Sequence, residues 1–218
     1  MKSFVTNIYN DRFDENIAQR NVLWQILCKD FFQKFIKKNS TVLDLAAGYC
    51  EFINNIEAKN KIAVDLNPQT KKMAKKDVQF YKALSTKLPR KLGGTIDVVF
   101  TSNFFEHLDN KDELMATLQE THRVLKKGGQ IMVLQPNIKL VGGAYWDFVD
   151  HTLPITEKSL AEALVLNGFE VTYQKTRFLP YTASAGKPIV PLFVKLYLRI
   201  PIAHYFMCKQ TFMIARKK

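Results

Sequence analysis

The chain has 218 residues, of which 47% are hydrophobic and 24% are charged. This composition is typical of a globular protein and argues against a disordered chain. Lysine and arginine outnumber aspartate and glutamate by 32 to 20, so the formal net charge is +12. Such a balance favours nucleic acid, an anionic membrane surface or an acidic substrate as the partner, without choosing among them.

The sequence carries no signal for export, membrane insertion or metal binding. Its first sixteen residues lack the apolar core of a secretory signal, and no stretch reaches the roughly 18 apolar residues that a spanning helix needs. Cys28, Cys50 and Cys208 share no motif spacing with each other or with the four histidines. We therefore expect a cytoplasmic protein with reduced thiols, no structural zinc and no other metal site.

Predicted helices and strands alternate along the chain. Helical spacing of apolar residues predicts a helix over 16–38, and the apolar run 41–46 predicts a buried strand. Further helices are predicted at 51–56, after Pro68, at 112–125 and at 157–166, and further strands at 61–66, 78–81, 95–101, 130–134, 169–176 and 210–216. Residues 126–128, Lys-Lys-Gly, are predicted to end the helix before them. This order predicts an α/β fold with a doubly wound parallel sheet, which binds ligands at the carboxyl ends of its strands.

The turn after the first strand predicts the kind of ligand. A dinucleotide motif G-x-G-x-x-G centred on Gly48 would need glycine at 46 and 51, where the chain has Ala46 and Glu51. A carboxylate at position 51 would repel a pyrophosphate. Asp65 ends the next predicted strand, 21 residues after Asp44, where a carboxylate can accept both hydroxyls of a ribose. These features favour a nucleoside ligand without phosphates over NAD or FAD.

Four segments, in order, resemble the motifs of class I S-adenosylmethionine-dependent methyltransferases. VLDLAAGYCEF (42–52) resembles the first motif, IAVDLN (62–67) the second, IDVVFTSNFFEHL (96–108) the fourth-strand motif, and ETHRVLKKGGQIMVLQPN (120–137) the stretch through strand five. The resemblance covers about residues 39–137. It implies a methyltransferase that uses S-adenosylmethionine, on a Rossmann-like seven-stranded sheet with the last strand antiparallel and helices on both faces.

The resemblance also implies which residues bind the cofactor. Gly48 would accommodate its methionine part and Asp65 its ribose, while Asn103 and Phe104 would line the pocket near the sulfonium. The full set comprises Asp44, Ala46, Gly48, Tyr49, Asp65, Leu66, Leu84, Ser85, Asn103 and Phe104. The chain departs from the family at positions 46 and 50, which are glycine there. The segment KALSTKLP also lacks the acidic residue that usually faces the adenine, which leaves Leu84 or Ser85 with backbone contacts.

The whole chain is expected to form a single methyltransferase domain. Its parts would be an N-terminal helical lid (1–38), the cofactor-binding core (39–137), an acceptor-side loop, helix and strand (138–181), an apolar basic insertion (182–209), and the last strand and tail (210–218). From Gln135 onward the sequence resembles a bacterial and archaeal subgroup, similar to methyltransferase domain types 11 and 12, which is often associated with surface-polysaccharide or glycolipid assembly.

Methyl transfer to a hydroxyl requires a group that removes a proton, and histidine suits that task near neutral pH. His151, with Asp150 beside it, follows the predicted fifth strand, and His107 follows the fourth. We expect these three residues to be catalytic, although His107 could equally bond within its own turn. Acceptor contacts are expected from Tyr145, Trp146, Arg177 and Tyr181, and from Tyr9 and Arg12 in the lid. The resemblance also implies a tyrosine and a basic residue of the lid near the methionine carboxylate of the cofactor, for which Tyr9, Arg12 and Arg20 are the candidates.

Residues 188–200 combine an apolar band with Lys195 and Arg199, which lie four residues apart. This pattern is typical of a helix at a membrane interface, although a helix that packs on the sheet of the same protein would have the same pattern. The acid-free stretch after Glu170 coincides with this insertion, which favours peripheral contact with an anionic membrane at its inner face. The ten basic residues among 59–91 are read as a solvated face.

The favoured function is O-methylation of a small-molecule or saccharide acceptor, which could be linked to lipid; an amine acceptor is less favoured. RNA methylation and a non-catalytic cofactor-binding or membrane-docked relative are the alternatives. The chain shows no RNA-binding module, and strand four lacks the Asp/Asn-Pro-Pro-aromatic motif of adenine-N6 enzymes.

Overall fold

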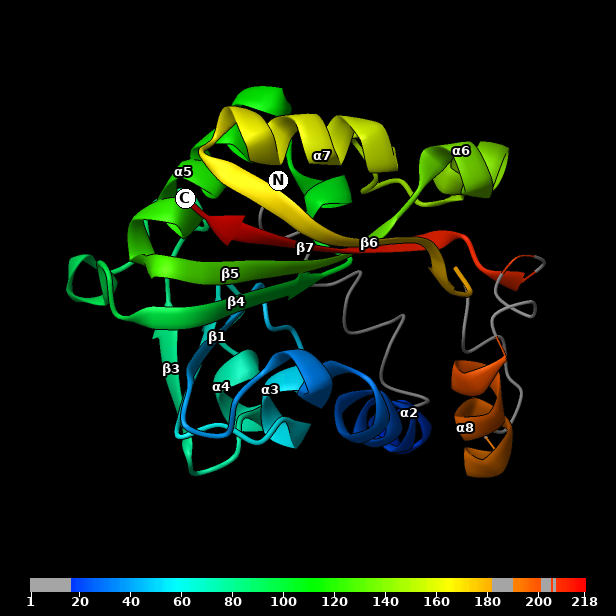
Figure 1. The fold of residues 1–218 in the computed structure, drawn as a ribbon, viewed down its shortest axis with the longest axis horizontal. Helices are drawn as coiled ribbons and strands as arrows, with labels where there is room; N and C mark the ends of the chain where they lie inside the picture. The colour runs from blue at the N-terminus through cyan, green and yellow to red at the C-terminus, as the bar shows by residue number, and fades with distance from the viewer. Residues whose placement is uncertain (1–16, 182–189, 201–204, 206) are drawn as a thin grey trace.

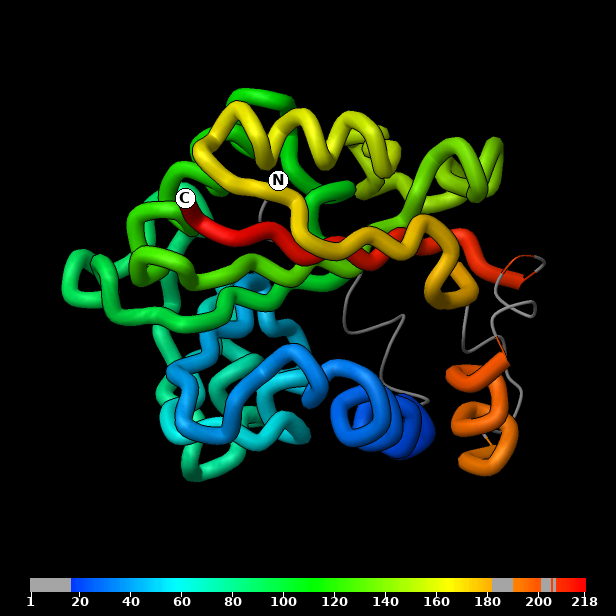
Figure 2. Tube along the Cα trace, viewed as in Figure 1, coloured from blue at the N-terminus to red at the C-terminus, as the bar shows by residue number. Residues whose placement is uncertain are grey.

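The computed structural model describes residues 17–181, 190–200, 205 and 207–218. Seven strands form one sheet in the order β3-β2-β1-β4-β5-β7-β6. The strands are β1 (Thr41–Leu45), β2 (Asn60–Asp65), β3 (Val78–Lys82), β4 (Ile96–Ser102), β5 (Leu125–Pro136), β6 (Phe169–Leu179) and β7 (Gln210–Lys217). Strands β1 to β5 pair in parallel, whereas β7 lies antiparallel between β5 and β6 (Figure 2). The predicted Rossmann-like sheet with an antiparallel last strand is confirmed.

Helices cover both faces of this sheet (Figure 1). One face carries α5 (Lys111–Val124) and α7 (Glu157–Leu166), and the opposite face carries α2 (Ile17–Asp30), α3 (Glu51–Asn55) and α4 (Thr70–Met73). Shorter elements are the 3-10 turns η2 (Phe32–Phe35), η3 (Arg90–Leu92), η4 (Phe105–His107) and η5 (Gly142–Asp147), and the helices α6 (Ile138–Val141) and α8 (Pro191–Arg199).

Alternating side chains of the strands divide the core into two clusters. Val99 of β4 packs with α5 and α7, whereas its neighbour Phe100 packs with α2 and α3. The second cluster is rich in aromatic rings, and the rings of Phe100 and Phe52 stack with centroids 3.7 Å apart. Because the parallel strands are covered on both faces, their sequences read as nearly continuous apolar runs.

Two sequence predictions of element boundaries are wrong. The helix predicted over 16–38 ends at Asp30 and is followed by the separate turn η2, after which Ile36 is extended. Residues 126–128 were expected to end the helix before them, but they lie in β5. The helix ends at Val124 because Leu125 is buried and pairs with Ile96 of β4, so sheet pairing begins before the glycine.

The topology places the ends of three strands together. Strand β1 has β2 on one side and β4 on the other. The strand order therefore reverses at β1, which is the switch point of the sheet. The carboxyl ends of β1, β2 and β4 therefore share one edge of the sheet, where doubly wound folds bind their ligands. Among the described residues, no helix is long and apolar enough to cross a membrane.

Candidate active site

The β1–α3 turn adopts a backbone that ordinarily requires glycine. Ala46, Gly48 and Cys50 have φ angles of 57°, 50° and 58°. For an L-residue other than glycine this region costs about 1–2 kcal/mol. Ala46 and Cys50 stand where the family has glycine, so both departures carry backbone strain. Packing holds Cys50 in place, since it is fully buried and its thiol lies 3.6 Å from the carbonyl oxygen of Thr70.

Asp65 connects the ends of β1 and β2. The backbone N–H of Gly48 donates to its Oδ2 atom at 2.8 Å, and that of Asn67 donates to Oδ1 at 2.7 Å. Burial raises the pKa of Asp65, and these backbone hydrogen bonds oppose the rise. Each carboxylate oxygen has a second lone pair, so Asp65 can hold the loop and still accept hydroxyls from a ribose.

Three carboxyl groups gather around this turn. Burial raises the pKa of Asp44, Glu51 and Asp65, and repulsion from the other two raises that of Asp44 further. Arg20 offsets one of these charges, because its Nη2 atom lies 2.7 Å from Glu51 Oε2, and its guanidinium lies over the ring of Tyr49 at 5.3 Å. Three buried carboxyl groups and one guanidinium therefore lie at this edge of the sheet.

Two buried oxygens at this edge have no hydrogen-bond partner among the described residues, namely Glu51 Oε1 and Asn103 Oδ1. Unsatisfied buried acceptors are rare and favour a donor-bearing ligand. S-adenosylmethionine carries a sulfonium and an ammonium group, so these acceptors and the carboxyl cluster fit its charge. The same arrangement does not fit a pyrophosphate.

The remaining predicted cofactor residues follow the same strands. Leu66, directly after β2, is 41% exposed, as an apolar side chain offered to a ligand would be. Asn103 follows β4 with a φ of 48°, and Phe104 beside it is half-buried. Leu84 and Ser85 follow β3, but the hydroxyl of Ser85 lies 2.8 Å from that of Thr117 on α5. The cofactor roles of all five residues stay predictions.

The structure brings His107, Asp150 and His151 together. His107 Nδ1 lies 3.1 Å from the carbonyl oxygen of Asp150 and 3.3 Å from its Oδ2 atom. His151 Nδ1 lies 2.9 Å from the carbonyl oxygen of Tyr145, and the hydroxyl of Tyr181 lies 3.3 Å away. The two imidazole rings have centroids 5.1 Å apart. Residues 44 positions apart in the chain thus form one cluster.

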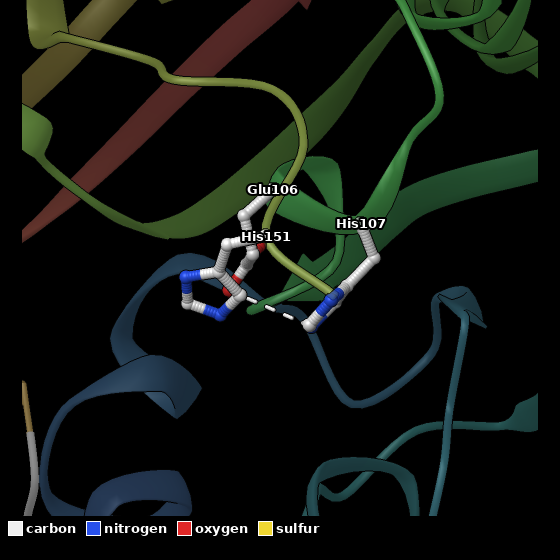
Figure 3. Close-up of side chains that lie close together, drawn as sticks. All are labelled: Glu106, His107 and His151. Atoms are coloured by element: carbon white, nitrogen blue, oxygen red, sulfur yellow. Dashed lines mark ion pairs between the residues drawn. The ribbon is translucent and has the colours of Figure 1, made fainter. Parts of the chain in front are cut away.

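Glu106 completes this cluster, and the sequence analysis missed it. Its side chain is 1% exposed, projects toward both histidines (Figure 3), and its Oε1 atom lies 4.0 Å from His107 Nε2. Gln135 donates to Oε2 at 2.8 Å, and burial raises the pKa of Glu106. The available signal was the position of Glu106, directly before a candidate catalytic histidine at the end of a strand.

The predicted acceptor residues differ in burial and in their contacts. Tyr145 is fully buried and its hydroxyl donates to the carbonyl oxygen of Leu153 at 2.5 Å, so it supports the loop and is not placed to touch an acceptor. Trp146 is 55% exposed, and Tyr181 lies at the histidine cluster. Arg177 instead contacts the carbonyl oxygen of Cys208 and the ring of Tyr205. Tyr9 and Arg12 lie outside the described residues.

Comparison with known proteins agrees with this geometry. Residues 43–133 match the methyltransferase domain family. An S-adenosylmethionine-dependent methyltransferase from Archaeoglobus fulgidus superposes with a TM-score of 0.66 at 19% identity, covering 96% of this chain and 98% of that one. A Thermotoga maritima enzyme described as a possible histamine N-methyltransferase superposes with a TM-score of 0.67 at 18% identity and the same coverage.

A third similar structure is a complex of the Haloferax volcanii Trm112 methyltransferase activator with a methyltransferase, with a TM-score of 0.61 at 14% identity, covering 88% of this chain and 96% of that one. No curated protein matches the chain significantly. The order of the strands, the turn after β1 and the match over residues 43–133 agree with one another. Residues 43–133 therefore match a methyltransferase domain, and the whole chain has the fold of class I, S-adenosylmethionine-dependent methyltransferases.

Proposed function

We propose that this protein transfers the methyl group of S-adenosylmethionine to a hydroxyl of a small-molecule or saccharide acceptor. When bound, the cofactor supplies a methyl group activated by its positive sulfur. Asp65 would hold its ribose, and the acidic edge formed by Asp44 and Glu51 would balance its positive charges. Asn103 Oδ1, directly after the end of β4, would accept a hydrogen bond from the cofactor.

The observation that carries the proposal is the pair of oriented imidazoles beside the end of β4. A carbonyl oxygen can only accept a hydrogen bond, so the carbonyls of Asp150 and Tyr145 favour a proton on Nδ1 of each ring. Each Nε2 atom then carries the lone pair that takes a proton. A hydroxyl, whose ordinary pKa is far above neutral, needs such an acceptor as it becomes a nucleophile.

Calorimetry with S-adenosylmethionine tests the cofactor half of this proposal. The intact protein should bind, Asp65→Asn should bind at least tenfold more weakly, and Asp77→Asn should bind normally. Asp77 is a suitable control because its carboxylate is 60% exposed and pairs with Lys61, away from the turn. If the intact protein does not bind the cofactor, the enzymatic function is wrong.

Formation of S-adenosylhomocysteine with a panel of acceptors tests the second half. The panel should contain phenols, monosaccharides, polyprenyl-linked sugars, amines and RNA. With the best hydroxyl acceptor, His151→Ala should lower the rate by about 10²–10⁴, whereas His122→Ala on α5 should not. Turnover of an amine or RNA but of no hydroxyl compound would contradict the acceptor class.

We further propose that α8 places the protein on an anionic membrane surface. Tyr197 and Leu198 pack against the core, whereas Leu192, Phe193 and Leu196 are 70%, 66% and 50% exposed. Lys195 and Arg199, also exposed, border this apolar strip on the same helix. A short helix with an apolar side and adjacent cations is typical of interfacial binding. Because its charged residues are positive, the helix should bind an anionic membrane surface.

Flotation with vesicles tests this contact. The wild type should float with vesicles that contain about 30% phosphatidylglycerol, and it should not float with purely zwitterionic vesicles. Phe193→Glu should abolish flotation, whereas Leu166→Glu, at an equally exposed leucine that ends α7, should not. Equal flotation of the wild type and Phe193→Glu would remove α8 as the contact.

A further inference from the structure

The cluster of Glu106, His107 and His151 has a second chemical capacity besides proton transfer. A carboxylate oxygen and one nitrogen from each histidine all lie within 4.8 Å of one another (Figure 3). Two imidazoles and one carboxylate form a donor set that binds divalent transition metals and leaves further coordination positions open. From this geometry we infer that Glu106, His107 and His151 bind a divalent transition-metal cation.

The hydrogen bonds of the two histidines suit this role. Each Nδ1 faces a backbone carbonyl, of Asp150 for His107 and of Tyr145 for His151, so Nε2 is the nitrogen with the lone pair. Metal-binding histidines characteristically donate their other ring N–H to a carbonyl or a carboxylate, which fixes the tautomer and the ring orientation. His107 has both kinds of acceptor, because Asp150 Oδ2 lies 3.3 Å from the same Nδ1.

Glu106 is held in a comparable way. Gln135, which is 2% exposed, donates to Oε2, and this contact turns Oε1 toward His107 Nε2 at 4.0 Å. Ligands at about 2.0–2.2 Å from one tetrahedral cation lie roughly 3.4 Å apart. The cluster therefore needs to contract by little more than an ångström, which small side-chain rotations of the two histidines supply.

The sequence predicts no metal site, because its cysteines and histidines do not have the spacing of a known metal-binding motif. The three ligands instead come from η4 and from the loop before α7, which are distant in the chain. The cysteines are not competing ligands, since Cys28, Cys50 and Cys208 are all buried away from solvent. Two imidazoles also favour zinc, iron, nickel or copper over magnesium or calcium, which prefer oxygen ligands.

The cation would have a defined part in the reaction. An open coordination position at the acceptor side would hold the acceptor oxygen and lower the pKa of its hydroxyl, as a metal does for bound water. The histidines would then act as ligands in the loaded protein and as proton acceptors only in the metal-free protein. This role rests on the proposed function, whereas the binding of the cation does not.

Titration with Zn²⁺ after removal of metals by a chelator tests the site. The wild type should bind one cation per chain, and Glu106→Gln and His151→Gln should each bind at least tenfold more weakly. Gln135→Leu, which removes the contact that orients Glu106, should weaken binding to a smaller degree. His122→Gln should bind as the wild type does, because His122 lies on α5 and packs against Phe169 at the start of β6, away from the cluster.

A second readout covers variants that fold poorly. Co²⁺ added to the wild type should give a visible absorption band typical of nitrogen and oxygen ligands, and excess Mg²⁺ should not displace it. No stoichiometric binding by the wild type, or unchanged binding by folded Glu106→Gln and His151→Gln, would overturn the site. Methyl transfer that is equally fast with and without Zn²⁺ would overturn the cation's role and leave the proposed function intact. Cation binding without methyl transfer to any acceptor would overturn the proposed function and leave the metal site intact.

Discussion

Replacing Asp44 by asparagine should stabilise the protein and weaken cofactor binding at the same time. Asp44 is 4% exposed, and burial together with repulsion from Asp65 and Glu51 raises its pKa well above the ordinary value. Asparagine has almost the same shape and still accepts the backbone N–H of Ile53. The substitution therefore removes a buried ionisable carboxyl group while the packing stays the same.

The sign of the pH dependence follows from the raised pKa. In the folded protein Asp44 holds its proton to higher pH than it does in the unfolded chain, so folding favours the protonated form. Its contribution to stability is present below the unfolded pKa, about 3.9, and is lost as the pH rises toward the folded pKa. Asparagine cannot ionise. The stability advantage of Asp44→Asn should therefore grow with pH over this interval, by at most about 1.4 kcal/mol per pH unit.

Urea unfolding at several pH values between 4 and 8 measures this difference, with Trp24 fluorescence as the signal because its ring packs against Phe32 and Phe100. Each kcal/mol corresponds to about 2–4 °C in melting temperature for a protein of this size. Asp147→Asn, at an exposed position, is the control for the same substitution at the surface. The reasoning fails if the Asp44→Asn advantage is the same at pH 4 and pH 8.

The same variant should bind S-adenosylmethionine about tenfold or more weakly at pH 7.5, because a hydrogen bond or close contact to a charged group is worth about 1.5–3 kcal/mol. Calorimetry of the two proteins checks this. A variant that is both more stable and equally able to bind would mean that the acidic edge does not serve the cofactor.

Three further predictions concern stability, and urea unfolding with circular dichroism checks each. Tyr145→Phe should cost about 1–3 kcal/mol, because it leaves the buried carbonyl of Leu153 without its donor; a neutral effect would mean that this hydrogen bond is dispensable. Thr156→Ala should cost about 0.5–2 kcal/mol through loss of the capping box of α7, and an unchanged midpoint would refute that role. Ala46→Gly should stabilise by about 1 kcal/mol or less, since relief of the positive φ is partly offset by the entropy of the unfolded chain; a loss of stability would show that no strain is stored there.

The strands of the sheet could be predicted from the sequence, because strands that are buried on both faces consist of nearly continuous apolar residues. Every predicted strand is present, and the helix 157–166 matches α7 at both ends. The strong turn signals at Gly48 and at Pro68 explain this success. Prediction failed where tertiary contact overrides local chemistry, as at Lys126–Gly128, which look like a helix end but extend a strand already pairing with β4.

The candidate site was only partly readable, for a related reason. His107, Asp150 and His151 each follow a strand or lie in a polar loop, so their positions at the edge of the sheet could be inferred. The position of Glu106 could be inferred in the same way, but its role could not, because that role depends on its burial beside two histidines from different segments. Likewise Tyr145 looked like an acceptor contact until its burial and its bond to Leu153 were seen.

Backbone strain and buried carboxyl groups occur together at the edge of the sheet where β1 and β4 end. In the part of the chain that the structure describes, the non-glycine residues with positive φ are Ala46, Cys50 and Asn103, and all three adjoin the ends of β1 and β4. The carboxyl groups with raised pKa around Asp44 lie at the same edge. Strain and buried charge persist only where the surroundings over-determine them, and they concentrate at ligand sites. A purely structural role for this edge would need a separate reason for each cost, whereas binding a cationic cofactor against a tight turn accounts for both.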